Sequence, residues 1–180
     1  MIALLKKVDT LVGRILSALM IATTASLMLL VTFIVVIRLF SIGSAAWTDE
    51  VVEFFFGWLV FLGAAALWRE KGHFAITMVA DLVLKTDRQR KILALITEFL
   101  CLPFLILFVY ESYVLIDGAS DTSPVFSISK AYWYVVMPIS GVIMAAYSIA
   151  RVVQHIIDLS QGRYAAPRPS TEIDAGKQAI

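Results

Sequence analysis

The residues with the greatest potential for chemistry are three glutamates inside long apolar runs, Glu53, Glu98 and Glu111. A carboxylate at membrane depth is costly, so such residues bind protons or cations, or pair with basic side chains. Glu98 and Glu111 stand 13 residues apart, which rotates them by roughly 220° on a helix, so they cannot share one face. Glu53 lies near a helix start, where its carboxylate can reach water or the helix dipole. For each glutamate we favour structural pairing over a transport role.

Other reactive side chains are too few to build a catalytic or metal site. The single cysteine, Cys101, lies in an apolar run and has no partner for a disulfide. His73 with Asp81, and the isolated His155, supply fewer donors than a metal site needs. No nucleophile has a histidine at a suitable depth, and no glycine-rich phosphate loop is present. The sequence therefore predicts no enzyme, no catalytic residues, and no cofactor or metal bound by this chain.

The composition requires a lipid environment for these residues. Sixty per cent of the 180 residues are hydrophobic and the mean hydropathy is +0.86, whereas soluble domains are roughly 45–50% apolar. Residues 15–37 carry no charge, and about 20 such residues cross the hydrocarbon as a helix. Further apolar runs occupy about 51–68, 92–116 and 132–150. We predict an all-α integral membrane protein, with four transmembrane helices in a single domain over residues 1–160.

Basic residues are distributed unevenly between the two sides of these spans. Of the 15 lysines and arginines, all but Arg38 and Lys130 fall in the first tail, the connection 69–91 or the last tail. Short loops rich in lysine and arginine stay in the cytoplasm. The sequence predicts a multi-pass protein of the bacterial inner membrane with both termini in the cytoplasm. Its net charge of only +1 gives no reason to expect nucleic acid as a partner.

The connection between the second and third spans has a helical pattern. His73, Thr77, Asp81 and Lys85 recur every four residues, and apolar residues fill most of the remaining circumference. This pattern is typical of a short amphipathic helix in the membrane interface. We predict such a helix at about 73–85 on the cytoplasmic side, with a packed re-entrant loop as the alternative.

The two ends of the chain allow further expectations. A small-residue stretch at 44–46 resembles a signal-peptide cleavage site, but the preceding apolar run is longer than the roughly 7–15 residues of a signal peptide. We therefore expect the first span to be retained. Residues 161–180 are polar and contain two prolines, which predicts a flexible cytoplasmic tail.

Local signals predict where helices begin and bend. Thr48, which precedes two acidic residues, is expected to cap the second helix. Thr86 and Gln89 form a capping box before the third helix. Pro103 and Pro138 each remove a backbone hydrogen bond, so each can bend its helix.

Aromatic and small residues point to packing surfaces. Trp47, Glu50, Phe54 and Trp58 fall on one helical stripe. Trp47 is compatible with an interfacial anchor, but Trp58 is too deep for one, so we favour contact with a partner. Small residues allow close helix approach, more often for bundle packing than for a binding cavity. The glycines of this kind are Gly57, Gly63 and Gly141.

An ordered series of residues carries a resemblance to a known family. In the first half it comprises Arg38, then Trp47, Thr48, Asp49 and Glu50, then Trp58 and the run from Leu59 to Ala65, then Arg69 and His73. In the fourth span it comprises Tyr134, Pro138, Ser140 and Gly141. The chain, from about residue 6 to residue 157, resembles the small membrane subunit (Q or DctQ-type) of tripartite ATP-independent periplasmic (TRAP) transporters. Thr77 is a departure, because an acid commonly follows the histidine by four positions in that family.

The resemblance implies a partner role. Members of the family work with a large membrane subunit (M, DctM-type) and a periplasmic substrate-binding protein (P). Together they import organic acids, including carboxylates and sulfonates, driven by a sodium gradient. The large subunit is thought to move the substrate by an elevator motion while the small subunit braces it, so sodium and substrate are expected on other chains. The residues expected at the subunit interface or in structural roles, besides contacts with membrane lipids, are Arg38, Trp47, Glu50, Phe54, Trp58, Arg69, His73, Pro138 and Gly141.

A rival hypothesis is a self-sufficient small ion-coupled carrier that uses Glu98 or Glu111. A membrane-embedded enzyme or redox subunit is disfavoured because histidines are not clustered. The central parts of the four spans contain no charge, whereas carriers of polar solutes place polar groups and broken helices at the midplane. A scaffold should purify with a much larger hydrophobic protein, and a carrier should transport alone.

Overall fold

The computed structural model describes residues 2–40, 46–70 and 87–161 of the chain. Within these ranges the elements are α1 (Ile2–Leu39), α2 (Ala46–Arg69), α4 (Asp87–Asp117), the short α5 (Ala131–Tyr134) and α6 (Val136–Ser160). Four helical stretches are long and apolar enough to cross a membrane, which confirms the predicted all-α membrane fold. The predicted interfacial helix at 73–85, and the predicted tail beyond residue 161, lie outside the described residues.

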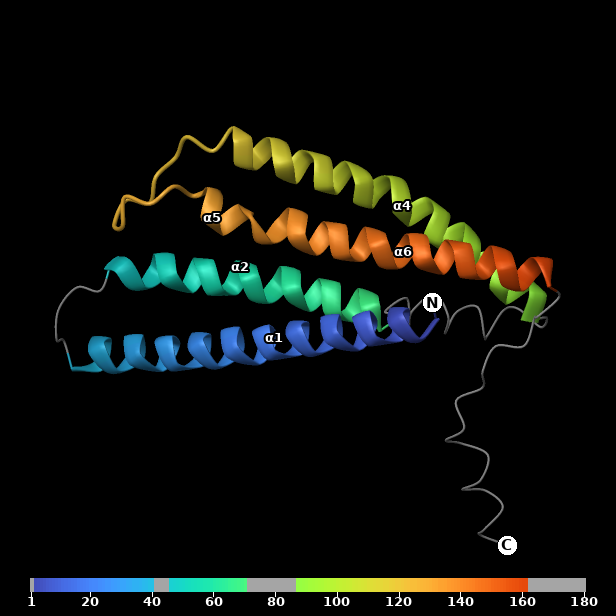
Figure 1. Ribbon diagram of the computed structural model, residues 1–180. Coiled ribbons are helices and arrows are strands. Elements are labelled where there is room, and N and C mark those ends of the chain that lie inside the picture. The colour runs from blue at the N-terminus through green and yellow to red at the C-terminus, as the bar shows by residue number, and fades with distance from the viewer. Residues whose placement is uncertain (1, 41–45, 71–86, 162–180) are drawn as a thin grey trace, which may run out of the picture.

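The long helices form a row rather than a closed bundle. α1 packs against α2, α2 against α6, and α6 against α4 (Figure 1). Among the described helices, the backbone of α1 makes no close contact with that of α4 or α6. The four long helices therefore form an open layer, with α1 and α4 at its edges.

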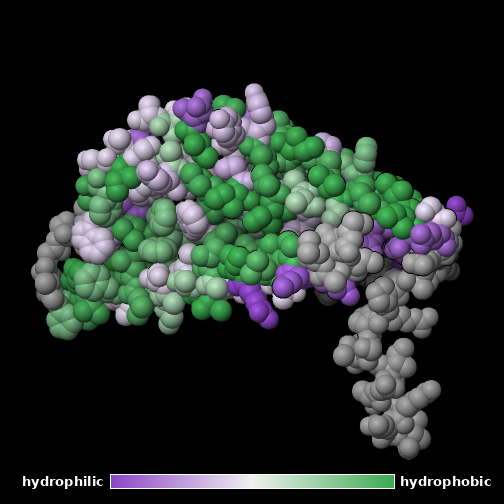
Figure 2. Space-filling model, viewed as in Figure 1, coloured by the Kyte–Doolittle hydropathy of each residue, from purple (hydrophilic) through white to green (hydrophobic). Residues whose placement is uncertain are grey.

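This open arrangement leaves most apolar side chains uncovered. The buried apolar core is small, and only 6% of the most apolar window of α1 is buried, against 28% for α6. The buried apolar core consists of Leu16, Leu62, Ala65, Leu105, Val136 and Met144. In Figure 2 hydrophobic residues cover much of the visible surface over the helices. Such an extended apolar surface needs lipid or another membrane protein to cover it.

Helix boundaries agree with the sequence signals in part. Thr48 lies inside α2, which already begins at Ala46, so the prediction that Thr48 caps this helix is wrong. The Thr48 side chain is buried in the first turn of α2, with 1% of its surface exposed. In the fourth span, the helix is interrupted at Val135, three residues before Pro138. The proline ring cannot donate to the carbonyl of residue 134 and clashes with it, which explains a break at this place.

Small residues bring α4 and α6 close together. A Cβ atom placed on Gly141 of α6 would lie 2.7 Å from Cγ2 of Val109 and 3.0 Å from Cδ1 of Phe108 on α4. Gly57 differs, because a Cβ atom placed there would meet nothing within 4 Å in this chain. Gly141 is therefore a packing glycine of the layer, whereas Gly57 faces open space.

We expect Gly141→Ala to lower the stability of the full chain by about 1–3 kcal/mol, because the added methyl overpacks the α4–α6 contact. Gly57→Ala is the matched control and should cause no loss. Thermal unfolding of the purified chain in detergent measures both effects. Equal midpoints for the two variants would contradict the assigned packing.

Candidate functional site: polar clusters that join the helices

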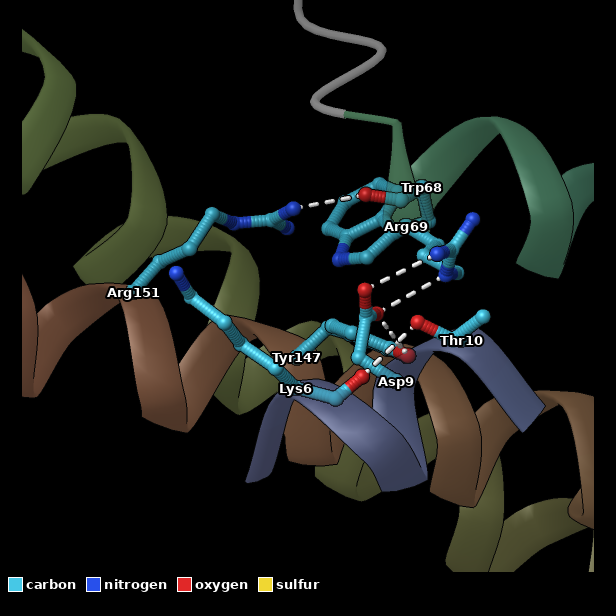
Figure 3. Close-up of polar contacts among 7 residues, drawn as sticks. All are labelled: Lys6, Asp9, Thr10, Trp68, Arg69, Tyr147 and Arg151. Atoms are coloured by element: carbon cyan, nitrogen blue, oxygen red, sulfur yellow. Dashed lines mark hydrogen bonds and ion pairs between the residues drawn. The ribbon is translucent and has the colours of Figure 1, made fainter. Parts of the chain in front are cut away.

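A polar cluster joins α1, α2 and α6 at the end of the layer where α1 begins (Figure 3). Arg69, the last residue of α2, donates from Nε to Oδ1 of Asp9 at 2.8 Å and from Nη2 to Oδ2 at 2.9 Å. The hydroxyl of Tyr147 on α6 donates to Oδ1 of Asp9 at 2.7 Å. A two-point contact between guanidinium and carboxylate fixes direction as well as distance. Asp9 thereby ties edge helix α1 to both inner helices.

A second cluster next to it joins α2, α4 and α6 around Arg151. The Arg151 guanidinium lies 2.5 Å from Oε1 of Glu98 through Nε, and donates from Nη1 to the backbone carbonyl of Trp68 at 2.6 Å. Its carbon Cζ lies 5.7 Å from the centre of the Trp68 ring. The Trp68 indole N–H donates to the hydroxyl of Ser148 at 2.8 Å. The Arg151 guanidinium on α6 thus binds groups on both α2 and α4.

The hydrogen bond from Arg151 to the carbonyl of Trp68 gives the end of α2 a partner for one of its last backbone carbonyls. The last carbonyls of an α-helix have no partner within the helix, and they carry the negative end of its dipole. Arg151 supplies both a donor and a positive charge to the end of α2. Because Glu98 is only 3% exposed, its carboxylate would be costly without Arg151. A more exposed pair, Lys91 with Asp158 at 3.1 Å, adds another link between α4 and α6.

A third cluster lies at the opposite end of the layer. The Glu50 carboxylate of α2 accepts a short hydrogen bond from the hydroxyl of Ser123, and another from the backbone N–H of Val125 at 3.1 Å. The Trp133 indole N–H donates to the backbone carbonyl of Glu50 at 3.4 Å. Glu50 therefore holds the segment between α4 and α5 against the start of α2.

The predicted aromatic stripe packs largely within this chain. The ring of Phe54 lies 5.5 Å from that of Trp58 and 5.4 Å from that of Trp133. The ring of Trp47 lies 6.2 Å from that of Phe33 on α1, yet Trp47 remains 38% exposed. Contact of this stripe with a partner stays a prediction, and Trp47 is its most accessible member.

The remaining predicted residues are placed in different surroundings. Among the three glutamates, Glu98 has the expected structural partner, whereas Glu53 and Glu111 are exposed and pair with no described residue. Arg38 lies exposed in the last turn of α1, where its charge complements the helix dipole. His73 lies outside the described residues.

Sequence reasoning missed Asp9, Tyr147 and Arg151 as partners. Asp9 and Arg151 were visible as charges close to the ends of spans, but their partners lie 60 and 53 residues away in the chain. Only the order of helices in the layer shows that these residues meet. Among the described residues, no group of three or more histidines, cysteines or acids could hold a metal ion.

The fold and these contacts define a multi-pass membrane protein of four long helices, joined by polar side chains near both ends. The family model for the DctQ component of tripartite ATP-independent periplasmic transporters matches residues 27–158, and the chain belongs to this family. A protein of Haemophilus influenzae described as a TRAP transporter small permease protein is 24% identical over 152 residues, covering 84% of this chain and 93% of that protein. The resemblance stated from the sequence is confirmed, and the family is one of transporter subunits rather than enzymes.

We expect Arg151→Gln to destabilise the chain by about 3–5 kcal/mol, because it leaves the buried carboxylate of Glu98 without its counter-charge. The double variant with Glu98→Gln should recover much of this loss, since no charge then remains buried. Lys91→Gln, in a more exposed pair, is the control and should cost about 1 kcal/mol. Unfolding in detergent compares the wild type with these variants and with the single variant Glu98→Gln, and simple additivity of the two single losses would contradict the pairing.

Glu50→Ala should loosen the segment from 118 to 130, because the variant removes the acceptor for Ser123 and Val125. Limited proteolysis of the detergent-solubilised chain should then cut this segment several-fold faster, as exposed and poorly held loops are preferred sites. Glu53→Ala removes an exposed carboxylate of the same helix and is the control. Equal cleavage rates in both variants would show that Glu50 does not hold the loop.

Proposed function

We propose that this chain is the scaffold subunit of a sodium-driven importer of organic acids in the bacterial inner membrane, with both termini in the cytoplasm. A large membrane subunit of the M (DctM) type would bind substrate and sodium and move by an elevator motion. A periplasmic binding protein would deliver carboxylates or sulfonates to it. Family membership supports the association with these partners.

The feature that best supports a scaffold is where the polar side chains point. Arg69, Glu98 and Arg151 bind groups on neighbouring helices of this chain, instead of facing a common cavity. Every such bond joins helices to one another and resists their sliding. A layer held near both ends is suited to remain fixed while a partner moves against it.

The open layer also supports a large contact area with a partner. Apolar residues of the edge helices are exposed along their length, including Met28 at 72% on α1 and Leu100 at 75% on α4. A closed bundle of the same helices would bury these residues against one another. A single layer presents two broad apolar faces, so the same short chain can contact a larger protein and still be anchored in lipid.

A self-sufficient carrier based on Glu98 or Glu111 finds less support. Glu98 is neutralised by Arg151, and Glu111 lies exposed on α4 without a partner among the described residues. The region between these glutamates is uncharged on α4, as are residues 15–37 on α1. A coupled carrier needs binding groups that both sides of the membrane can reach in turn.

Reconstitution separates the two functions. Proteoliposomes with the chain alone should not accumulate organic anions under an imposed sodium gradient, whereas addition of the large subunit and the binding protein should give uptake. Glu111→Gln in the complete system should keep sodium coupling, because sodium is proposed to bind to the large subunit. Uptake by the chain alone, or loss of coupling in Glu111→Gln, would contradict the scaffold function.

A further inference from the structure

A shallow groove of about 460 Å³ lies along residues 10–21 of α1, beside Arg69 at the end of α2. Its polar end holds Thr10, Arg14 and Ser17 together with the Arg69 guanidinium. Ala18 and Ile21 continue the same stripe of α1 further along the helix. Residues three and four apart lie on one helix face, so the groove passes from basic and hydroxyl groups to apolar ones along a single face.

The charges in this groove do not balance. Asp9 neutralises Arg69 through two hydrogen bonds to Nε and Nη2, which leaves the remaining guanidinium nitrogen, Nη1, without a bond to that carboxylate. Arg14 is exposed and forms no ion pair or hydrogen bond with any described residue. The positive charge of Arg14 is therefore unbalanced, and it lies in the same groove as the Arg69 guanidinium.

Gly13 explains why the guanidinium can lie across α1. A Cβ atom at this position would come within 2.6 Å of Cζ and 2.7 Å of Nη1 of Arg69. Any other residue would push the guanidinium away from the helix. The absence of a side chain thus keeps Arg69 flat over the turn that carries Thr10 and Arg14 (Figure 3 shows Arg69, Asp9 and Thr10).

We propose that this groove binds the headgroup of an anionic phospholipid, with the phosphate between Arg14 and Arg69 and an acyl chain along Ala18 and Ile21. Guanidinium groups suit phosphate because their donors form a planar fork. The hydroxyl of Ser17 can donate a further hydrogen bond, whereas the hydroxyl of Thr10 already donates to the backbone carbonyl of Lys6 at 2.9 Å. Basic pockets at the ends of transmembrane helices are suited to acidic lipid headgroups.

The apolar continuation of the groove favours a lipid over a soluble phosphate. A free phosphate would use only the basic end and would gain nothing from Ala18 and Ile21. The groove also opens at the end of the helix layer where α1 and α4 begin with the described basic residues Lys6, Lys7, Arg88 and Arg90. A lipid in this position would fill the angle between α1 and the end of α2.

The experiment measures lipid binding to the purified full chain in nanodiscs of phosphatidylcholine, with and without phosphatidylglycerol. Native mass spectrometry counts retained lipids, and thermal unfolding reports stabilisation. Arg14→Gln should weaken phosphatidylglycerol binding about threefold to tenfold, as expected for loss of one charged hydrogen-bonding group. Ala18→Phe, which fills the apolar part without changing charge, should weaken it as well. Arg88→Gln removes another exposed arginine from the same end of the layer and should have no effect.

Each possible result of this experiment either supports or overturns the lipid site. Selective loss in Arg14→Gln and Ala18→Phe, with Arg88→Gln unchanged, supports the lipid site. Equal weakening by Arg88→Gln would show general attraction between basic side chains and anionic lipid, and would overturn the proposal. Equal stabilisation by soluble glycerol phosphate would overturn the assignment to lipid. If Arg14→Gln instead reduced recovery of a co-expressed large subunit with lipid binding unchanged, Arg14 would be a protein contact and the proposal would fail.

Discussion

The contact between Arg151 and Glu98 is the interaction on which the arrangement of the inner helices depends. It places a positive charge where α2 ends, α4 passes and α6 continues, and the guanidinium binds a group on each of the two neighbouring helices. Neither charge is tolerated alone at this degree of burial, since an isolated buried carboxylate or guanidinium costs several kcal/mol. Because each charge needs the other, the helices that carry them are held in one relative position. Hydrophobic packing by itself would not select that position, as lipid competes for the same apolar surfaces.

The layer needs polar contacts at its two ends for the same reason. Its buried apolar core is small, and edge helix α1 packs only against α2 among the described helices. Asp9 compensates by reaching past α2 to the hydroxyl of Tyr147 on α6. At the opposite end, Glu50 performs a similar task for the segment that leads into α5. Polar groups near the membrane surfaces can be desolvated at less cost than groups at the midplane, so the end positions are the favourable places for such bonds.

The elements of the fold could be predicted from the sequence, but their order could not. The length of the apolar runs identified all four spans, because the hydrocarbon thickness sets a minimum that few other segments meet. The same apolar character hides which face of each helix meets a neighbour, so a closed bundle and an open row have equal support in the pattern. For the site, Glu98 was correctly expected to need a structural partner, yet Arg151 could not be chosen without knowing that α4 lies beside α6. The prediction that Thr48 caps α2 was wrong, because a threonine before two acids is equally compatible with a buried position in the first turn.

An open layer exposes more apolar surface to lipid or a partner protein than a closed bundle of the same four helices. In a bundle the four helices satisfy one another, and a partner can gain only the outer surface. In the present row the edge helices keep apolar side chains available to lipid or protein, as the exposure of Met28 on α1 and Leu100 on α4 illustrates. Rigidity must then come from the polar contacts near the ends, since the middle of the layer has too few buried side chains to provide it. Such a division keeps the middle of the layer largely apolar, in agreement with the proposed function as a fixed support.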